Sequence, residues 1–212
     1  LIGPPGCGKT YLAKAIATTG RGVLFADANA ISPMTSIAIG EAITASGGKY
    51  VDVSIIGSAR NLENGATFYA SGQNASEFAT LQNFGLRVQV LGDQIGQASA
   101  FKMVYAGLTK GLSSLAVELL LTARALGILD AILEKYRLSF PEIAQFMAHT
   151  LPGLPLRAAR RSQEMDELSA TIEHSGLSPI MAPASGRVLK GIGDLELRSK
   201  YTEQDESQWS LK

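Results

Sequence analysis

The stretch GDQIGQASAFKMVYAGLTKGLSSLAVELLLTARALG, residues 92–127, decides how the rest of the chain is interpreted. It contains no proline, and from Gln97 to Leu126 its apolar residues recur at helical spacing. At 1.5 Å per residue such a helix would be about 45 Å long, the size of a small domain. We therefore predict one long helix, continuous or interrupted once. Because it is apolar on most sides, we expect other elements to cover it.

Two glycines and two lysines mark this helix. Gly107 and Gly111 lie four residues apart on one face, where each lowers helix propensity. They predict the close approach of another backbone or of a ligand to that face. Lys102 lies near the helix start, where a lysine is ordinarily a solvated charge, and Lys110 is interpreted as a structural or surface residue.

Short apolar strands alternate with helices before this stretch, which predicts a largely parallel sheet with connections on its faces. The predicted strands are residues 22–27, 50–56, 66–70 and 86–91, and the predicted helices are 33–45, opened by Ser32, and 74–83. Beyond the long helix the pattern is helical, with segments at 139–150, 157–173 and 184–191.

The fold class that follows is α/β followed by all-α. Residues 1–95 are predicted to form a partial Rossmann-like domain with a parallel sheet. Residues 96–198 are predicted to contain the long connecting helix and a helical C-terminal domain. Residues 199–212 are polar and are predicted to be a frayed tail.

The composition narrows the class of protein. The 46% hydrophobic and 18% charged residues are typical of a folded soluble chain. Nineteen basic against nineteen acidic residues give no electrostatic reason to expect nucleic acid or an anionic membrane as a partner. Cys7 is the single cysteine, which favours a reducing, cytoplasmic compartment. Glu118 and Arg124 interrupt the best candidate membrane span. His149 and His174 have no partners at metal-binding spacing, so no metal is expected.

The first ten residues, LIGPPGCGKT, contain a complete G-x-x-x-x-G-K-T phosphate loop. Glycines such as Gly6 and Gly8 let backbone N–H groups surround a phosphate. Lys9 can reach the terminal phosphates of a nucleotide, and the hydroxyl of Thr10 can hold Mg²⁺. Over residues 1–17 the sequence resembles the Walker A segment of AAA+ ATPases, which implies Mg-ATP binding.

Other ATPase elements do not follow. A Walker B strand ends in Asp, usually Asp-Glu in that family, but the nearby candidate strand ends in Asp27 and is followed by Ala28. That strand also comes too soon after the loop helix. The segment is therefore also interpreted as a loop that binds phosphate weakly, or as a piece joined from another gene.

Three other blocks carry a resemblance across most of the chain. They are DANAISP at residues 27–33, VDVSIIGSARNLENGATFYASG at 51–72 and GQASAFKMVYAGLTKG at 96–111. In this order they resemble the C-terminal part of the β-hydroxyacid dehydrogenase superfamily, in particular the 6-phosphogluconate dehydrogenase-like branch. RRSQEMDELSAT at 160–171 resembles the helical domain of that branch. The resemblance covers about residues 22–190.

The resemblance implies an NAD(P)-dependent oxidoreductase acting on a small hydroxy acid. Lys102 falls on the family's catalytic lysine, which shuttles a proton while hydride passes to or from nicotinamide. Asn29 and Ser32 would lie beside NAD or NADP. Gly57 and Ser58 fall on the substrate-binding glycine pair.

The departures from the family are specific. Ala106 stands where the family has asparagine, and Tyr105 or Thr109 could supply a polar group instead. The family's G-x-G-x-x-G dinucleotide fingerprint is replaced by the Walker-type loop. We therefore interpret the chain as a chimera, by natural fusion, faulty gene model or engineering.

Three functions remain open at this point. The first is the NAD(P)-dependent dehydrogenase, impaired or not by the missing fingerprint. The second is an ATP- or phosphate-binding P-loop module. The third is a non-catalytic fragment that dimerises through its helical domain, as related dehydrogenases often do.

The predicted helical segment 157–173 carries three arginines at helical spacing, Arg157, Arg160 and Arg161. They could bind a substrate carboxylate or phosphate, or they could form a solvated face paired with Glu164.

Overall fold

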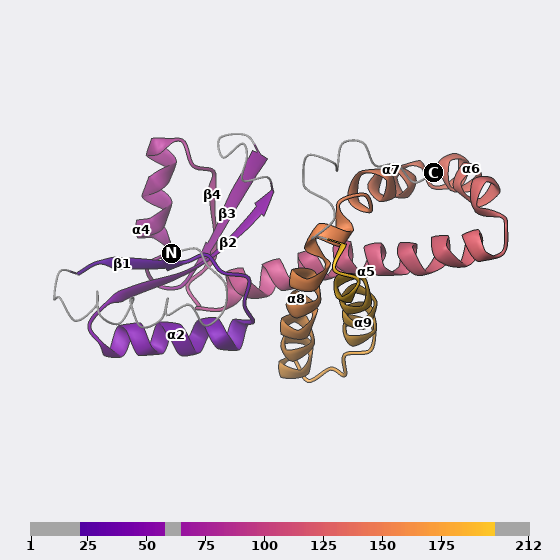
Figure 1. The fold of residues 1–212 in the computed structure, drawn as a ribbon. Helices are drawn as coiled ribbons and strands as arrows, with labels where there is room; N and C mark the ends of the chain where they lie inside the picture. The colour runs from indigo at the N-terminus through magenta and orange to yellow at the C-terminus, as the bar shows by residue number, and fades with distance from the viewer. Residues whose placement is uncertain (1–21, 58–64, 198–212) are drawn as a thin grey trace. The chain divides into compact units, whose positions relative to one another are not determined.

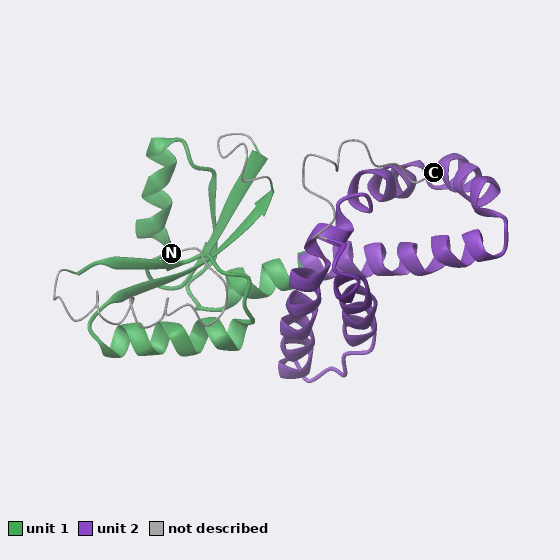
Figure 2. Ribbon diagram, viewed as in Figure 1, with its two compact units in different colours: residues 1–105 green, residues 106–212 purple. Residues whose placement is uncertain are grey.

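The computed structural model describes residues 22–57 and 65–197 of the chain. The chain divides into two compact units, Leu1–Tyr105 and Ala106–Lys212 (Figure 2). The Walker-type segment 1–17, Ser58 and the polar tail 199–212 lie outside the described residues.

The first unit contains a four-stranded sheet in the order β1-β2-β3-β4 (Figure 1). The β1–β2 and β3–β4 pairs are parallel, as predicted, whereas β2 and β3 are antiparallel. Only eight residues separate Gly57 from Ala66, too few for the crossover that a parallel pair requires. The strands are β1 (Leu24–Asp27), β2 (Lys49–Gly57), β3 (Ala66–Ser71) and β4 (Val88–Gly92).

Helices cover both faces of this sheet, because successive side chains of β2 point to opposite sides. Tyr50 packs with Ile43 of α2 (Pro33–Ala45), while Val51 and Val53 pack with Phe78 of α4 (Ala75–Ala79). The bounds predicted for α2 are confirmed, and Ser32 is its N-cap. The helix predicted at 74–83 is the short α4 followed by the 3₁₀ segment Thr80–Phe84.

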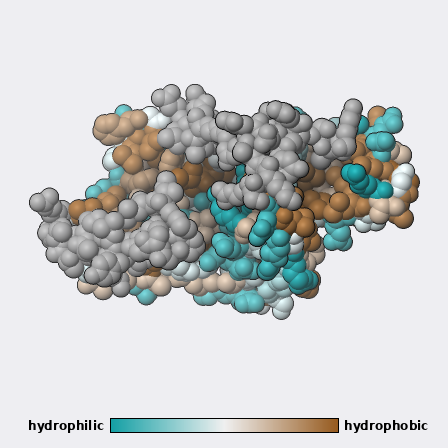
Figure 3. All heavy atoms as spheres, in the orientation of Figure 1, coloured by the Kyte–Doolittle hydropathy of each residue, from teal (hydrophilic) through white to brown (hydrophobic). Residues whose placement is uncertain are grey.

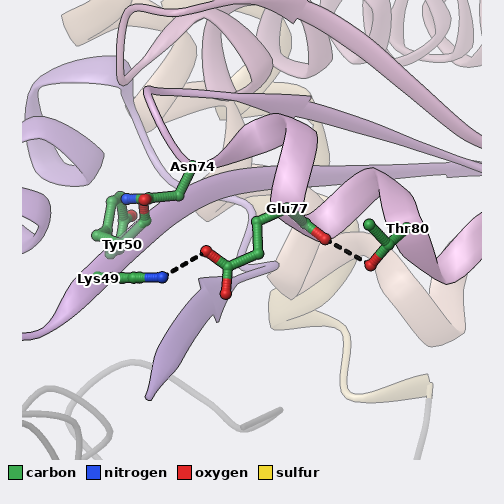
Figure 4. Close-up of polar contacts among 5 residues, drawn as sticks. All are labelled: Lys49, Tyr50, Asn74, Glu77 and Thr80. Atoms are coloured by element: carbon green, nitrogen blue, oxygen red, sulfur yellow. Dashed lines mark hydrogen bonds and ion pairs between the residues drawn. The ribbon is translucent and has the colours of Figure 1, made fainter. Parts of the chain in front are cut away.

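Polar contacts attach α4 to the start of β2 (Figure 4). The Asn74 side-chain amide donates to the backbone oxygen of Tyr50 over 3.0 Å. Lys49 forms an ion pair of 2.7 Å with Glu77, whose backbone oxygen accepts from the Thr80 hydroxyl. Both charged side chains are about half exposed, so the ion pair orients α4 and adds little stability.

The predicted long helix is α5 (Gln97–Ala125), which is continuous over 29 residues. It begins in the first unit and ends in the second. The remainder of the second unit is helical, as predicted: α6 (Leu129–Ser139), α7 (Pro141–Thr150), α8 (Leu154–His174) and α9 (Met181–Asp194). The last helix begins before the predicted position 184 because Pro183 occupies its first turn, where no N–H is needed.

The two glycines of α5 differ in their surroundings. A Cβ on Gly107 would lie 2.6 Å from a methyl carbon of Leu168 on α8. The predicted close approach is therefore present at this glycine, and it is made by a side chain. At Gly111 the nearest atom, the Ser185 hydroxyl oxygen, is 3.9 Å away, so the prediction is wrong there.

The expectation that other elements cover α5 is wrong within the described chain. Leu108 and Leu121 are 67% and 62% exposed, and further apolar side chains are exposed along α6 and α7. Figure 3 shows such side chains at the surface of the second unit. The described residues leave these apolar groups uncovered.

Length and composition alone would also allow α5 to cross a membrane, with a mean hydropathy of 1.3 over 18 residues and 22% of that window buried. Glu118 and Arg124 therefore do not exclude a span on these criteria, contrary to the sequence prediction. The core helix of a soluble protein can have the same length and composition. Polar residues of α5, such as Ser99 and Lys110, are buried against other elements of their own units.

Candidate active site

One face of the sheet carries a row of buried polar side chains. Asp27 on β1 is in register with Asp52 on β2, and Asp52 is in register with Ser71 on β3. All three are at most 4% exposed. Burying a carboxylate costs folding free energy unless the group is hydrogen-bonded. The hydrogen-bond partners of these three side chains therefore indicate their structural role.

Asp52 joins the sheet to the start of α5. One carboxylate oxygen accepts the backbone N–H groups of Gly96 and Ser99, both over 3.0 Å, and the Ser71 hydroxyl over 3.1 Å. The other oxygen accepts the Ser99 hydroxyl over 2.7 Å. The Ser71 oxygen also accepts the N–H of Ala98. Asp52 and Ser71 thus satisfy N–H groups that a helix leaves without partners at its N-terminus.

Tyr50 lies in the same layer as this row. Its hydroxyl and that of Ser36 on α2 are 2.9 Å apart and form a buried hydrogen bond. Burial, and next the negative charge of Asp27, raise the pKa of the Tyr50 hydroxyl well above its usual value. Tyr50 therefore stays protonated across the physiological range.

Asn29 and Ser32 follow β1 at the C-terminal end of that parallel strand. The backbone N–H and side-chain amide of Asn29 both donate to one oxygen of Asp27, which forms a turn. Ser32 is 3% exposed, and its hydroxyl oxygen accepts the N–H of Thr35 and bonds to the Thr35 hydroxyl. Both predicted cofactor residues are thus held at the N-terminus of α2, where ligands of open α/β sheets commonly bind.

The start of α2 and the start of α5 are in contact. A Cβ on Gly96 would lie 3.3 Å from both the carbonyl oxygen and the Cβ of Pro33. Gly96 also has φ of +97°, a conformation that favours glycine. The preceding Ile95 packs against Tyr50 and closely approaches Gly40 and Gly72. The loop that leads into α5 is therefore wedged between α2 and the sheet.

Lys102 lies three residues beyond Ser99 on α5 and is half-buried. Ser99 bonds to Asp52, and the Phe101 ring lies 4.5 Å from that of Tyr69. Tyr69 is in register with Ser54, two residues beyond Asp52 on β2. The first turns of α5 are therefore attached to the sheet at Asp52 and Tyr69, and Lys102 directly follows Phe101 on this helix.

Gly57, one of the two predicted substrate residues, lies farther along β2. Gly57 ends the strand with φ of +115°, and a Cβ there would collide with the carbonyl oxygen of Gly65. It lies five residues beyond Asp52, roughly 16 Å along an extended strand. The structure therefore does not bring Gly57 to the Asp52 row. Between them, the Ser54 hydroxyl is buried and has no hydrogen-bond partner among the described residues.

The helical unit contains a buried ion pair. Lys110 on α5 forms an ion pair of 2.6 Å with Glu164 on α8, and the two side chains are 8% and 17% exposed. Arg160, which is 73% exposed, also contacts Glu164 over 3.4 Å. Lys110 is thus a structural residue, and the pairing of the arginine face with Glu164 is present for Arg160. Within the described ranges, no three His, Cys, Asp or Glu side chains are grouped to hold a metal.

The residues missed by sequence reasoning are Asp52, Ser71 and Ser99. One signal was present, because Asp52 interrupts the otherwise apolar run YVDVSII. An aspartate in such a strand is expected to have a partner, but sequence spacing could not identify donors 44 to 47 residues away. The predicted phosphate-binding residues, Gly6, Gly8, Lys9 and Thr10, lie outside the described residues, as does Ser58.

Two family profiles match parts of the chain. A domain of unknown function, DUF1932, matches residues 123–192. The ATPase family associated with various cellular activities (AAA) matches residues 1–64, of which the structure describes 22–57. Each covers about a third of the chain, so neither assigns the whole chain to a family.

One curated protein is similar over a longer region. The uncharacterized 28.5 kDa protein in the 7S RNA 5' region of Methanothermus fervidus is 29% identical over 170 residues, 80% of this chain and 66% of that protein. The chain thus spans slightly less than two thirds of the length of this curated relative.

Two solved structures extend the comparison. The 3-hydroxyisobutyrate dehydrogenase (ygbJ) from Salmonella typhimurium is 19% identical with a TM-score of 0.65, covering 82% of this chain and 65% of that one, which shows a shared fold. The conserved protein MTH1747, of unknown function, is 31% identical with a TM-score of 0.71. The match covers 89% of this chain and 74% of MTH1747, whose structure is described as similar to 3-hydroxyacid dehydrogenases. This chain therefore belongs to the family of 3-hydroxyacid dehydrogenase-like proteins.

Proposed function

We propose that the chain is an NAD(P)-dependent oxidoreductase that acts on a small hydroxy acid. The observation that carries the proposal is the position of Lys102. Lys102 follows the start of α5, where Ser99 is hydrogen-bonded to Asp52 and Gly96 packs against Pro33. Pro33 itself comes directly after the loop that contains Asn29 and Ser32. The candidate proton-transfer residue Lys102 and the candidate cofactor residues Asn29 and Ser32 belong to the same compact unit, which supports the proposal.

The described residues fit the nicotinamide end of a dinucleotide. Asn29 and Ser32 are polar, lie at the C-terminal end of β1 and are held in place by Asp27 and Thr35. These two residues would hold the cofactor. When bound, NAD or NADP would supply the hydride acceptor and donor.

Residues of this chain would transfer the proton and bind the substrate. Lys102 would accept the hydroxyl proton of the substrate during oxidation and return it during reduction. Gly57 and Ser58 would contact the substrate at the far end of β2. The position of Ala106 makes Tyr105 or Thr109 the candidate second polar group; the Thr109 hydroxyl donates to the backbone oxygen of Ala106.

Titration with NADPH, NADH and Mg-ATP separates this function from the P-loop alternative. We expect saturable enhancement of NADPH or NADH fluorescence and a weaker affinity in Asn29→Ala. The P-loop module is favoured by the AAA match and by the motif ending in Lys9 and Thr10. Mg-ATP binding that Lys9→Ala abolishes, together with no dinucleotide binding, would favour that module and contradict the dehydrogenase.

We also propose a cytoplasmic location for the protein. The single cysteine, Cys7, supports a reducing compartment.

We also propose that the chain forms a homodimer through its helical unit. The supporting observation is the exposure of large apolar side chains there, including Leu108, Leu121 and Leu138 at more than 60%. We expect sedimentation to give the mass of a dimer and Leu108→Glu to shift it toward monomer. Phe84→Ser, which changes an exposed apolar residue of the first unit, should leave the mass unchanged. A wild-type monomer at all concentrations would contradict the proposal.

A further inference from the structure

Asp52 has the largest number of hydrogen bonds of the buried carboxylates described above. Its four bonds come from Gly96, Ser99 and Ser71, and the residue is 1% exposed. Two of these donors are backbone N–H groups at the beginning of α5. A carboxylate is the favoured partner for such groups, because it also meets the positive end of the helix dipole.

The same helix start is held from other sides. Gly96 is in contact with Pro33 of α2, and Ile95 packs against Tyr50. Within the helix, Phe101 lies against Tyr69 of β3. These apolar contacts limit how far α5 can move, whereas the hydrogen bonds to Asp52, together with that of Ala98 to Ser71, specify its register and its rotation about its own axis, because hydrogen bonds are directional.

Lys102 follows Ser99 by three residues, less than one helical turn. A rigid helix transmits any shift or rotation at Ser99 directly to Lys102. We infer that Asp52 is a positioning residue: its hydrogen bonds to the first turn of α5 determine where the Lys102 amine lies relative to the substrate site. This inference rests on the proposed function for its catalytic meaning.

The geometry predicts which substitutions matter. Asp52→Ala removes all four bonds. In Asp52→Asn the amide oxygen can replace the oxygen that accepts three bonds, and the NH₂ group can donate to the Ser99 hydroxyl oxygen. The asparagine therefore preserves the connection without the charge. Ser99→Ala removes one hydrogen bond and provides a milder variant if Asp52→Ala folds poorly.

The first arm of the test does not require turnover. Lys102 is acetylated with acetic anhydride in the whole chain, and its labelling rate is measured by mass spectrometry with exposed Lys190 as internal reference. We expect a several-fold change of the Lys102 rate in Asp52→Ala or Ser99→Ala, and a rate near wild type in Asp52→Asn. An unchanged Lys102 rate in a folded Asp52→Ala or Ser99→Ala variant would overturn the inference.

The second arm measures turnover of 3-hydroxyisobutyrate with NAD⁺ or NADP⁺. We expect Asp52→Ala to lower kcat at least about tenfold with an unchanged KM for the dinucleotide, since small misplacements of a catalytic group are costly. Asp52→Asn should retain most of kcat, and Glu77→Gln, at an exposed ion pair of the same unit, should retain all of it.

A double-mutant cycle distinguishes positioning from general stability. In the Lys102→Ala background, we expect Asp52→Ala to cause no further loss of turnover. An equal loss in both backgrounds would overturn the positioning role and leave the proposed function intact. If Lys102→Ala itself turns over like the wild type, the proposed function is wrong, and the labelling rates alone decide whether Asp52 positions Lys102.

Discussion

Glu164→Leu is expected to destabilise the helical unit by about 3–5 kcal/mol, a large part of the stability of an ordinary domain. The substitution leaves the Lys110 ammonium buried without its carboxylate partner. An unpaired buried charge costs far more than a lost surface ion pair, because the charge has been removed from water without compensation. Urea unfolding followed by far-ultraviolet circular dichroism measures the loss.

Two control variants make this prediction specific. Arg160→Ala breaks the other contact of Glu164, but Arg160 is exposed and should contribute about 1 kcal/mol or less. The double variant Lys110→Met/Glu164→Leu removes both charges and should recover most of the stability. Equal destabilisation by Arg160→Ala and Glu164→Leu would show that the buried pair has no special role.

Lys102→Ala is expected to lower kcat by about 10²–10⁴-fold, the usual contribution of a positioned proton-transfer group. The free energy of unfolding should change little, because Lys102 is only half-buried at the surface of the first unit. Steady-state kinetics with 3-hydroxyisobutyrate and both dinucleotides provides the measurement. The KM for the dinucleotide should stay near its wild-type value.

Lys190→Ala is the matched control for this substitution. Lys190 is an exposed lysine of the helical unit, paired with Asp194 four residues later. Its replacement should leave kcat unchanged. Similar losses in Lys102→Ala and Lys190→Ala would contradict a catalytic role for Lys102.

The fold could be predicted largely from local patterns. The Ser32 cap and the apolar spacing before residue 46 define α2, and the proline-free run after Gly96 defines α5. The largely parallel sheet that was predicted is confirmed, but the prediction did not say which pair of strands would be antiparallel. The short connection between Gly57 and Ala66 was the relevant signal.

The candidate site could be predicted only in part. Asn29, Ser32 and Lys102 were found through family resemblance, and their arrangement about Gly96 could not be predicted because it depends on contacts between distant segments. Asp52 was missed for the same reason, since its donors lie on a helix 44 to 47 residues later. Local sequence specifies which elements form, whereas packing determines which side chains meet.

The exposure of α5 shows a different limit. Apolar periodicity correctly identified a helix that needs apolar contacts, but it could not say which chain supplies them. Buried residues such as Met103 and Ala116 face the described chain, while Leu115 and Leu119 remain exposed. Apolar periodicity predicts which residues need apolar contacts. It does not predict whether those contacts are made within one chain or with another chain.

Deuteride transfer tests the central claim most directly. The chain is incubated with NAD⁺ or NADP⁺ and with a panel of small hydroxy acids, each deuterated at the carbon that bears the hydroxyl group, and the reduced dinucleotide is analysed by mass spectrometry. The account predicts that one deuterium appears on the dinucleotide, and that its rate of appearance falls about 10²–10⁴-fold in Lys102→Ala. A wild-type chain that transfers no deuterium, or transfers it equally well without Lys102, would contradict the account.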